Sequence, residues 1–405
     1  MTTSTGHKPA GSLMLIAGIL LISANMRAPI TGIAPLLETI RTTFGLATTE
    51  AGALTTLPLL AFALTSPFAV LQAREYGLER SLFIALVMTA VGIALRSVGR
   101  VEYLFLGTAV IGVGIAIANV LLPSLLKRDF PHKVAAMTSA YALTAGLFAA
   151  IASSLAVPIA TLPGSGWGWA LGAIIVLPLA AMAVWLPQLT KHTAPAKGTA
   201  TPPHGGRIWR SGLAWQVTLF LGCNSMIYYT VIAWLPTILT DAGYSTAAAG
   251  SLHGISQLAT AAPGLFLGAI IGRLRDQRAL AFGFAITTGL SVLGFVVFPQ
   301  TAVIWAITFG CSSSAVFILG LAFVSMRAAN AHQAAGLSAM AQFVGYLLAA
   351  TAPPIIGLLH DRLDSWTAPL ITCSVVCGVM AVIGMLAGRS RHIFEGTSLQ
   401  GATVH

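Results

Sequence analysis

The sequence is poor in charged residues. Asp, Glu, Lys and Arg make up only 8% of its 405 residues, whereas 56% are hydrophobic. An ordinary soluble domain carries roughly a quarter charged residues. That much apolar surface is incompatible with a soluble fold, so the composition indicates a chain that crosses a membrane many times.

Acidic side chains are the scarcest group, with eleven in total and none deep inside an apolar run. Paired acids, histidine clusters and nucleophile–base pairs are therefore missing from the apolar runs, and we expect no enzyme site. No Gly–xxxx–Gly–Lys loop is present, which argues against a fused nucleotide motor. The cysteines lie in apolar runs without neighbouring His, Asp or Glu, so we expect packing residues and neither a metal nor a cofactor. They are Cys223, Cys311, Cys373 and Cys377.

Apolar stretches of about 20 residues, the length that spans a bilayer, recur twelve times. They predict an all-α polytopic membrane protein with twelve transmembrane helices. The expected spans lie near 13–37, 48–72, 79–98, 101–126, 133–160, 166–189, 212–239, 246–272, 278–298, 301–325, 333–359 and 366–388.

The basic residues are distributed unevenly between the loops. With the N-terminus inside, sixteen of the 21 Lys and Arg residues fall on the cytoplasmic side, and Arg27 lies within the first span. The outer side receives Arg41, Arg96, Arg100 and Arg362. The positive-inside rule then places both termini in the cytoplasm. The net charge of +10 is a topology signal, so we expect a lipid bilayer and no nucleic acid as partner, and a monomer.

The two halves of the chain resemble each other at an offset of about 200 residues. "HKVAAMTSAYALTAGLFAA" from His132 matches "HQAAGLSAMAQFVGYLLAA" from His332, and "NMRAPITGIAPL" from Asn25 matches "NSMIYYTVIAWL" from Asn224. An even number of spans separates the copies, so the repeats are parallel. We expect a six-helix half at 1–189, a Pro- and Gly-rich cytoplasmic linker at 190–211, a second half at 212–390 and a cytoplasmic tail at 391–405.

Two parallel six-helix halves with a central linker resemble the major facilitator superfamily. Within it, "NMRAPITGIAPLL", "LLPSLLKRDFPHKVA", "LAWQVTLFLGCNSMIYYTVIAWLPTIL" and "AHQAAGLSAMAQFVGYLLAA" resemble the cyanate/2-nitroimidazole transporter family. The resemblance implies a secondary transporter of the bacterial inner membrane that moves a small, planar, acceptor-rich solute by alternating access around a midplane site. A multidrug or efflux-type carrier of other small organic solutes is the alternative. A channel is disfavoured, because no ring of charges is present.

The loop between the second and third spans departs from the superfamily's Asp–Arg–x–Gly signature. It reads "REYG" at 74–77, whereas "GRLRD" at 272–276 keeps the glycine-to-aspartate spacing in the second half. The resemblance implies a gating loop at these places, with Arg74 and Glu75 in the first half and Asp276 and Arg278 in the second.

Arg27 is the one full charge placed within a span. Counted from Leu13 it lies about 20 Å into a core about 30 Å thick, with Ser23 and Thr31 on the same helical face. Pro29 and Pro35 predict a bend just beyond it. Its planar fork suits two coplanar oxygens, so we expect a substrate anchor. The alternative is a structural arginine satisfied by carbonyls near Pro29.

The repeat places Met226 opposite Arg27, in the stretch "CNSMIYYT". Tyr229 and Thr230 share the equivalent face and are the favoured substrate contacts, because tyrosine can stack on a planar solute and orient it. Asn224 and Tyr228 are second choices.

Further polar side chains lie within other spans. His253 and Gln257 share a face of the eighth span, and His253 is the candidate proton carrier, with a packing role as its alternative. The other expected contacts are Asn119, Gln342 and Tyr346.

Overall fold

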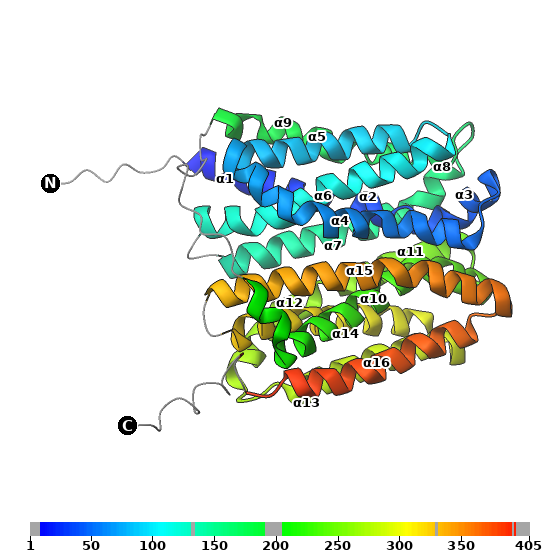
Figure 1. The fold of residues 1–405 in the computed structure, drawn as a ribbon. Helices are drawn as coiled ribbons and strands as arrows, with labels where there is room; N and C mark the ends of the chain where they lie inside the picture. The colour runs from blue at the N-terminus through cyan, green and yellow to red at the C-terminus, as the bar shows by residue number, and fades with distance from the viewer. Residues whose placement is uncertain (1–8, 131–133, 191–204, 329–330, 391–392, 394–405) are drawn as a thin grey trace, which may run out of the picture.

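The computed structural model describes residues 9–130, 134–190, 205–328, 331–390 and residue 393 (Figure 1). The first half contains α1 (Pro9–Asn25), α2 (Ala28–Thr31), η1 (Ala34–Leu36), α3 (Leu37–Phe44), α4 (Thr48–Tyr76), α5 (Leu78–Arg96), α6 (Val101–Asp129), α7 (Val134–Ala160), α8 (Trp167–Ala173), α9 (Val176–Trp185) and η2 (Leu186–Thr190).

The second half contains η3 (Gly205–Arg210), α10 (Gly212–Asp241), α11 (Thr246–Ala259), α12 (Ala262–Arg273), α13 (Arg278–Val297), η4 (Pro299–Thr301), α14 (Ala302–Arg327), α15 (Ala331–Leu363) and α16 (Thr367–Ala387). Most of the expected linker, 191–204, lies outside the described residues, as does the expected tail except for Ile393.

The predicted membrane fold is confirmed. Within the described ranges the chain is helical without strands, and 11 segments are long and apolar enough to cross a membrane. The remaining predicted span is α4, a 29-residue helix that packs against α6 and α15.

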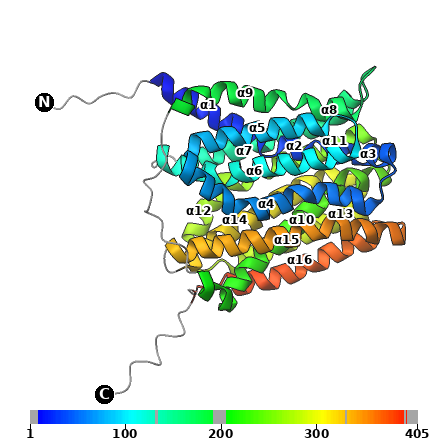
Figure 2. The same cartoon turned by 45° about the horizontal axis from the view of Figure 1, so that its top comes forward.

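The helices of the two halves form two groups that meet side by side. In Figure 1, residues 9–190 occupy the upper part of the bundle and residues 205–390 the lower part. In the turned view of Figure 2, α4 of the first half lies next to α15 of the second. The groups meet where α4 packs on α15 and α7 packs on α11. The described ends of the chain lie at one end of the bundle, here called the near end, and the opposite end, which holds α3, is called the far end.

The halves approach most closely toward the far end. A Cβ added to Gly52 of α4 would lie 2.8 Å from the Cα of Pro354 in α15. A Cβ on Gly250 of α11 would lie 3.1 Å from the carbonyl oxygen of Ser153 in α7. A Cβ at Gly52 would clash with the opposing backbone, and a Cβ at Gly250 would require the opposing backbone to shift by a few tenths of an ångström. The far end is therefore closed in this structure.

Three spans are broken near their middles, each shortly before a proline. The sixth span is interrupted at Ile174 and Ile175, between α8 and α9, and Pro178 lies in the first turn of α9. The first span is interrupted at Met26 and Arg27, between α1 and α2, and Pro29 lies in the first turn of α2. The eighth span is interrupted at Thr260 and Ala261, and Pro263 lies in the first turn of α12. The chain is irregular again at Gly32 and Ile33, between α2 and η1 and shortly before Pro35, so the expected bend beyond Arg27 is present. The additional break at Arg27 itself arises because Pro29 cannot donate the hydrogen bond of the preceding turn.

Candidate functional site

The breaks in the first and eighth spans meet at a small, partly open cavity of about 70 Å³. The first half contributes Arg27 to the cavity wall. The second half supplies the remaining wall from α10, the α11–α12 break, α14 and α15. These residues are Asn224, Ser225, Tyr228, Tyr229, Thr260, Ser313, Ser314, Phe317 and Tyr346.

Arg27 contacts the second half directly. Its Nη1 donates to the Thr260 hydroxyl at 2.9 Å, and that hydroxyl donates in turn to the Gln257 carbonyl at 2.7 Å. No acidic residue pairs with Arg27 within the described part of the chain. One guanidinium in a polar, partly aromatic cavity is therefore available to an acceptor-bearing solute.

The broken eighth span is held by side chains of α14. Pro263 leaves the Ala259 carbonyl without its helical donor, and the Cys311 thiol donates to that oxygen at 3.3 Å. The Ser314 hydroxyl donates to the Thr260 carbonyl at 2.6 Å. Cys311 is thus a hydrogen-bond donor as well as a packing residue, and α14 holds Thr260 beside Arg27.

Aromatic rings form part of the cavity wall. The rings of Tyr228 and Tyr229 meet edge to face with centroids 5.3 Å apart, and Tyr228 stacks on Phe309 at 6.4 Å. Tyr346 of α15 meets Phe62 of α4 edge to face at 5.4 Å, so one cavity residue also touches the first half. Such walls bind flat solutes by stacking.

The structure brings Arg27, Asn224, Tyr228, Tyr229 and Tyr346 to one cavity and places the other expected contacts elsewhere. Thr230 is buried and its hydroxyl donates to the Met226 carbonyl of its own helix at 2.7 Å. Gln342 is exposed and donates to Ser338 at 3.1 Å. Asn119 is half-buried in α6, away from the cavity wall. Helix rotation sets these positions, and sequence spacing only approximates it.

Five further residues line the cavity that the sequence did not predict: Ser225, Thr260, Ser313, Ser314 and Phe317. Pro263 signals the break that exposes Thr260, and the run Ser312–Ser313–Ser314 signals a polar face on α14. Nothing in the spacing distinguishes Phe317 from a packing residue.

His253 is fully buried and lies outside the cavity wall. Its Nδ1 is 2.6 Å from the Ser153 hydroxyl of α7, and its Nε2 is 3.4 Å from the Gln257 amide nitrogen. Gln257 Oε1 accepts from the Tyr228 hydroxyl at 2.8 Å. His253 therefore reaches the cavity through Gln257 and Tyr228, and not directly as expected.

Comparison with known proteins agrees with this architecture. Residues 13–350 match the Major Facilitator Superfamily. The chain belongs to the major facilitator superfamily. A 2-nitroimidazole transporter of Escherichia coli (strain K12) is 51% identical over 393 residues, covering 97% of this chain and 100% of that protein. The cyanate transport protein CynX of the same strain is 29% identical over 349 residues, covering 85% and 89%.

A solved structure shares the fold of this facilitator. The crystal structure of a bacterial homolog to the human lysosomal transporter Spinster, inward-facing and unoccupied, superimposes with a TM-score of 0.74 at 15% identity. The match covers 95% of this chain and 98% of that one. The protein is therefore a multi-pass membrane transporter and not an enzyme.

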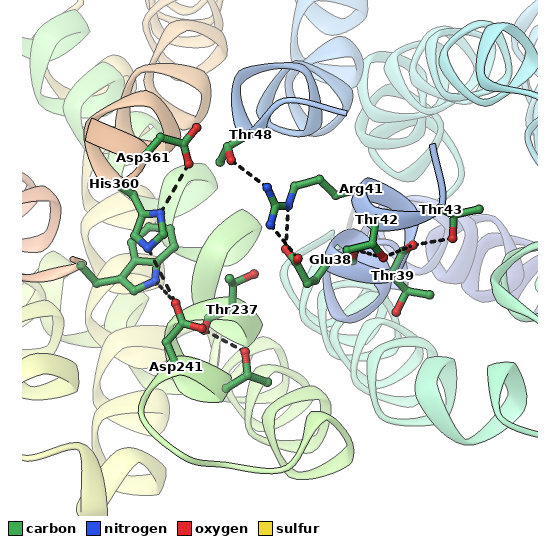
Figure 3. Close-up of polar contacts among 12 residues, drawn as sticks. Glu38, Thr39, Arg41, Thr42, Thr43, Thr48, Thr237, Asp241, His360 and Asp361 are labelled. Atoms are coloured by element: carbon green, nitrogen blue, oxygen red, sulfur yellow. Dashed lines mark hydrogen bonds and ion pairs between the residues drawn. The ribbon is translucent and has the colours of Figure 1, made fainter. Parts of the chain in front are cut away.

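The far end of the facilitator carries a polar cluster from both halves (Figure 3). On α3, Arg41 makes two hydrogen bonds to Glu38 at 2.8 and 2.9 Å. On the opposing half, the His360 ring nitrogens lie 3.7 Å from Asp241 and 3.7 Å from Asp361. The negative charges of Asp361 and Asp241 add a favourable interaction with Arg41, which complements the glycine contacts that close this end.

The near end holds polar contacts other than those expected of the gating loop. The Arg74 side chain lies outside the described atoms, and Glu75 is exposed. Asp276 and Arg278 form an ion pair at 3.7 Å. A close ion pair at the base of the third span joins Glu79 and Arg128, whose Nη2 lies 2.7 Å from the carboxylate.

Arg96 lies inside the protein and not on the outer surface as expected. Its side chain is 1% exposed, and its Nη1 donates to the Pro29 carbonyl at 2.6 Å. Pro29 belongs to the broken stretch that follows Arg27, where the helical bonding pattern is irregular. A guanidinium in α5 thus satisfies a carbonyl of the broken first span.

Proposed function

We propose that this facilitator moves a small, planar, acceptor-rich solute, a cyanate-like anion or a nitroimidazole-like heterocycle, with Arg27 as the substrate anchor. The observation that carries the proposal is the position of Arg27: it lines the cavity, binds only a neutral hydroxyl there, and has no acidic partner in the described chain. A nitro or carboxylate group presents two coplanar acceptors that fit a guanidinium fork.

The charge and size of the cavity support this substrate class. Its volume of about 70 Å³ is well below the roughly 300–1,000 Å³ of pockets that hold drug-sized ligands. A compact anion fits that space, and a small heterocycle needs only modest side-chain movement. A multidrug carrier would need a much larger cavity, which makes this alternative the weaker one. The substrates named for the two relatives point in the same direction.

Alternating access follows from the two-half design. Arg27 and Thr260 join the halves across the cavity, so a solute that takes the donors of Arg27 replaces a contact between halves. We place the near end in the cytoplasm and the far end outside, with both termini cytoplasmic, in the bacterial inner membrane. With this orientation, the closed far end is a closed extracellular gate. The transporter acts as a monomer, with halves at 1–189 and 212–390 joined by a linker.

The deciding experiment is binding of 2-nitroimidazole and of cyanate to purified protein. Arg27→Ala should abolish binding while leaving insertion and purification intact. Arg27→Lys keeps the charge without the fork and should bind much more weakly than wild type. Arg100→Ala is the matched control, because Arg100 is an exposed arginine paired only weakly with Glu102 at 3.6 Å. Normal binding by Arg27→Ala would remove the anchor role.

A further inference from the structure

Arg96 is the last residue of α5, and its side chain points into the protein. Long basic side chains at the ends of spans normally extend outward to the membrane surface. Arg96 is instead 1% exposed. Its Nη1 donates to the Pro29 carbonyl at 2.6 Å, whereas its Nε and Nη2 are buried without a hydrogen-bond partner among the described residues. No acidic side chain forms an ion pair with it in that part of the chain.

The surroundings of Arg96 are unfavourable for the stability of the fold. A buried guanidinium whose charge is unpaired and whose nitrogens are partly unsatisfied lowers stability. A neutral donor could satisfy the Pro29 carbonyl without that cost. An ionisable side chain inside a membrane protein that does not stabilise the fold indicates a functional role.

The carbonyl that Arg96 binds belongs to the short helix α2, which begins directly after Arg27. In a regular α-helix the Pro29 carbonyl would accept from the backbone nitrogen of Ile33. That nitrogen donates to the Ile30 carbonyl instead, at 3.3 Å. The Arg27 carbonyl accepts from two backbone nitrogens of α2, each at 3.0 Å. The backbone of Arg27 is thus joined to α2, and the place of α2 determines the place of Arg27.

Hydrogen bonds from two directions attach α2 to its own half of the molecule. On one side Arg96 of α5 donates to Pro29. On another side the Thr31 hydroxyl donates to the Ala149 carbonyl of α7 at 3.3 Å. The bond from Arg96 is the shorter of the two and comes from a charged donor, which makes it the stronger one.

We propose that Arg96 is a positioning residue for solute binding: through the Pro29 carbonyl it holds α2 in the place from which Arg27 reaches the solute. The inference rests on the proposed function and adds a residue from outside the cavity wall to the same site. A displaced α2 would leave the Arg27 fork misaligned with the acceptor atoms, and hydrogen bonds weaken steeply when misaligned. Loss of Arg96 should therefore weaken binding without weakening the fold, because its unpaired guanidinium is costly to bury.

Arg96→Met distinguishes positioning from a structural role, because methionine keeps an apolar stem and removes both the donor and the charge. The variant should bind 2-nitroimidazole more weakly, on the order of 10-fold, the effect of about one hydrogen bond. Its melting temperature in detergent should equal or exceed that of wild type. Arg96→Lys keeps a charged donor and should recover most of the lost affinity. Arg100→Met is the matched control and should bind as wild type does, because the Arg100 side chain is 67% exposed.

Two outcomes of these measurements would contradict the proposal. A lower melting temperature of Arg96→Met, or its failure to fold, would assign Arg96 a structural role and overturn the inference. Wild-type affinity in Arg96→Met would overturn it as well.

A measurement without solute separates this inference from the proposed function. Amide hydrogen exchange in residues 28–33 should be faster in Arg96→Met than in wild type or Arg100→Met, because α2 loses an attachment. Unchanged exchange in this segment would overturn the inference. The expected exchange, in a wild type that binds neither 2-nitroimidazole nor cyanate, would support the attachment of α2 by Arg96 and count against the substrate class.

Discussion

The Glu79–Arg128 ion pair has an uncharged counterpart in the second half of the molecule. Arg128 Nη2 lies 2.7 Å from a Glu79 oxygen, and Arg327 Nη2 lies 2.7 Å from the Gln277 side-chain oxygen. Each arginine comes from the near end of the fourth span of its half and reaches the start of the third span. The internal repeat thus preserves a contact while changing its charge. The hydrogen bonds that Arg128 donates to the carboxylates of Asp129 and Glu79 raise the pKa of Arg128, so this arginine stays charged throughout the physiological range.

The comparison with the Arg327–Gln277 contact predicts how the Glu79–Arg128 pair tolerates substitution. Glu79→Gln should lower stability only slightly, because the amide keeps the acceptor oxygen that Gln277 provides in the other half. Arg128→Met should cost more, on the order of 2–4 kcal/mol, because a carboxylate that is 2% exposed loses a charged donor. Thermal unfolding in detergent measures both variants. A greater loss for Glu79→Gln would contradict the argument.

The close packing of α5 on α6 predicts a strict requirement for Gly107. A Cβ there would lie 2.5 Å from the backbone nitrogen of Arg96 and from the carbonyl oxygen of Gly92. Gly107→Ala should destabilise the protein by about 1–3 kcal/mol, the cost of overpacking. Gly378→Ala in α16 is the control, because its Cβ would meet no atom within 4 Å. Equal melting temperatures of the two variants would refute the clash.

Two substitutions of Tyr229 distinguish stacking from hydrogen bonding in the cavity. Tyr229→Phe keeps the ring against Tyr228 and should cost ~0.5–1.5 kcal/mol of binding free energy if the hydroxyl contacts solute. Tyr229→Ala should cost more, because the stacking surface is lost as well. Titration calorimetry with 2-nitroimidazole measures both. Negligible effects of both substitutions would place Tyr229 outside the binding surface.

His253 is the candidate for energy coupling. We expect an imposed gradient, acidic outside, to accelerate uptake into proteoliposomes by wild type, because His253 can take a proton once far-end opening removes Ser153. His253→Gln should retain flux down a solute gradient and lose the acceleration. An ionophore that collapses the gradient serves as the control. If the gradient has no effect on uptake by wild type, His253 is a packing residue and not the coupling site.

The spans were predictable from sequence because bilayer thickness imposes their length. The expected seventh span, 212–239, is α10 at Gly212–Asp241, and the expected ninth, 278–298, is α13 at Arg278–Val297. The partition of the helices into two groups likewise follows the repeat. These features depend on composition over many residues, so single side chains hardly affect them.

The cavity was predictable only in part, because it depends on helix rotation and on local breaks. Arg27 and the tyrosines stand out in an apolar run, and they do reach the cavity. Ser313 and Ser314 do not stand out, because serine is common in packed membrane helices. Arg96 looked like a loop residue because it ends its span, and only the packing of α5 reveals its contact with Pro29.

The unpaired charge of Arg27 has an electrical consequence for the transport cycle. If an anion binds at Arg27 as proposed, it neutralises the site, so the loaded carrier would cross between its two states without moving net charge, whereas the empty carrier would return with a positive one. An inside-negative membrane potential acts on that return step with up to about 2.3 kcal/mol per 100 mV for a full crossing. It holds the empty carrier facing the cytoplasm and favours anion release outward. A neutral solute leaves the charge in place in both directions, so its exchange is indifferent to voltage.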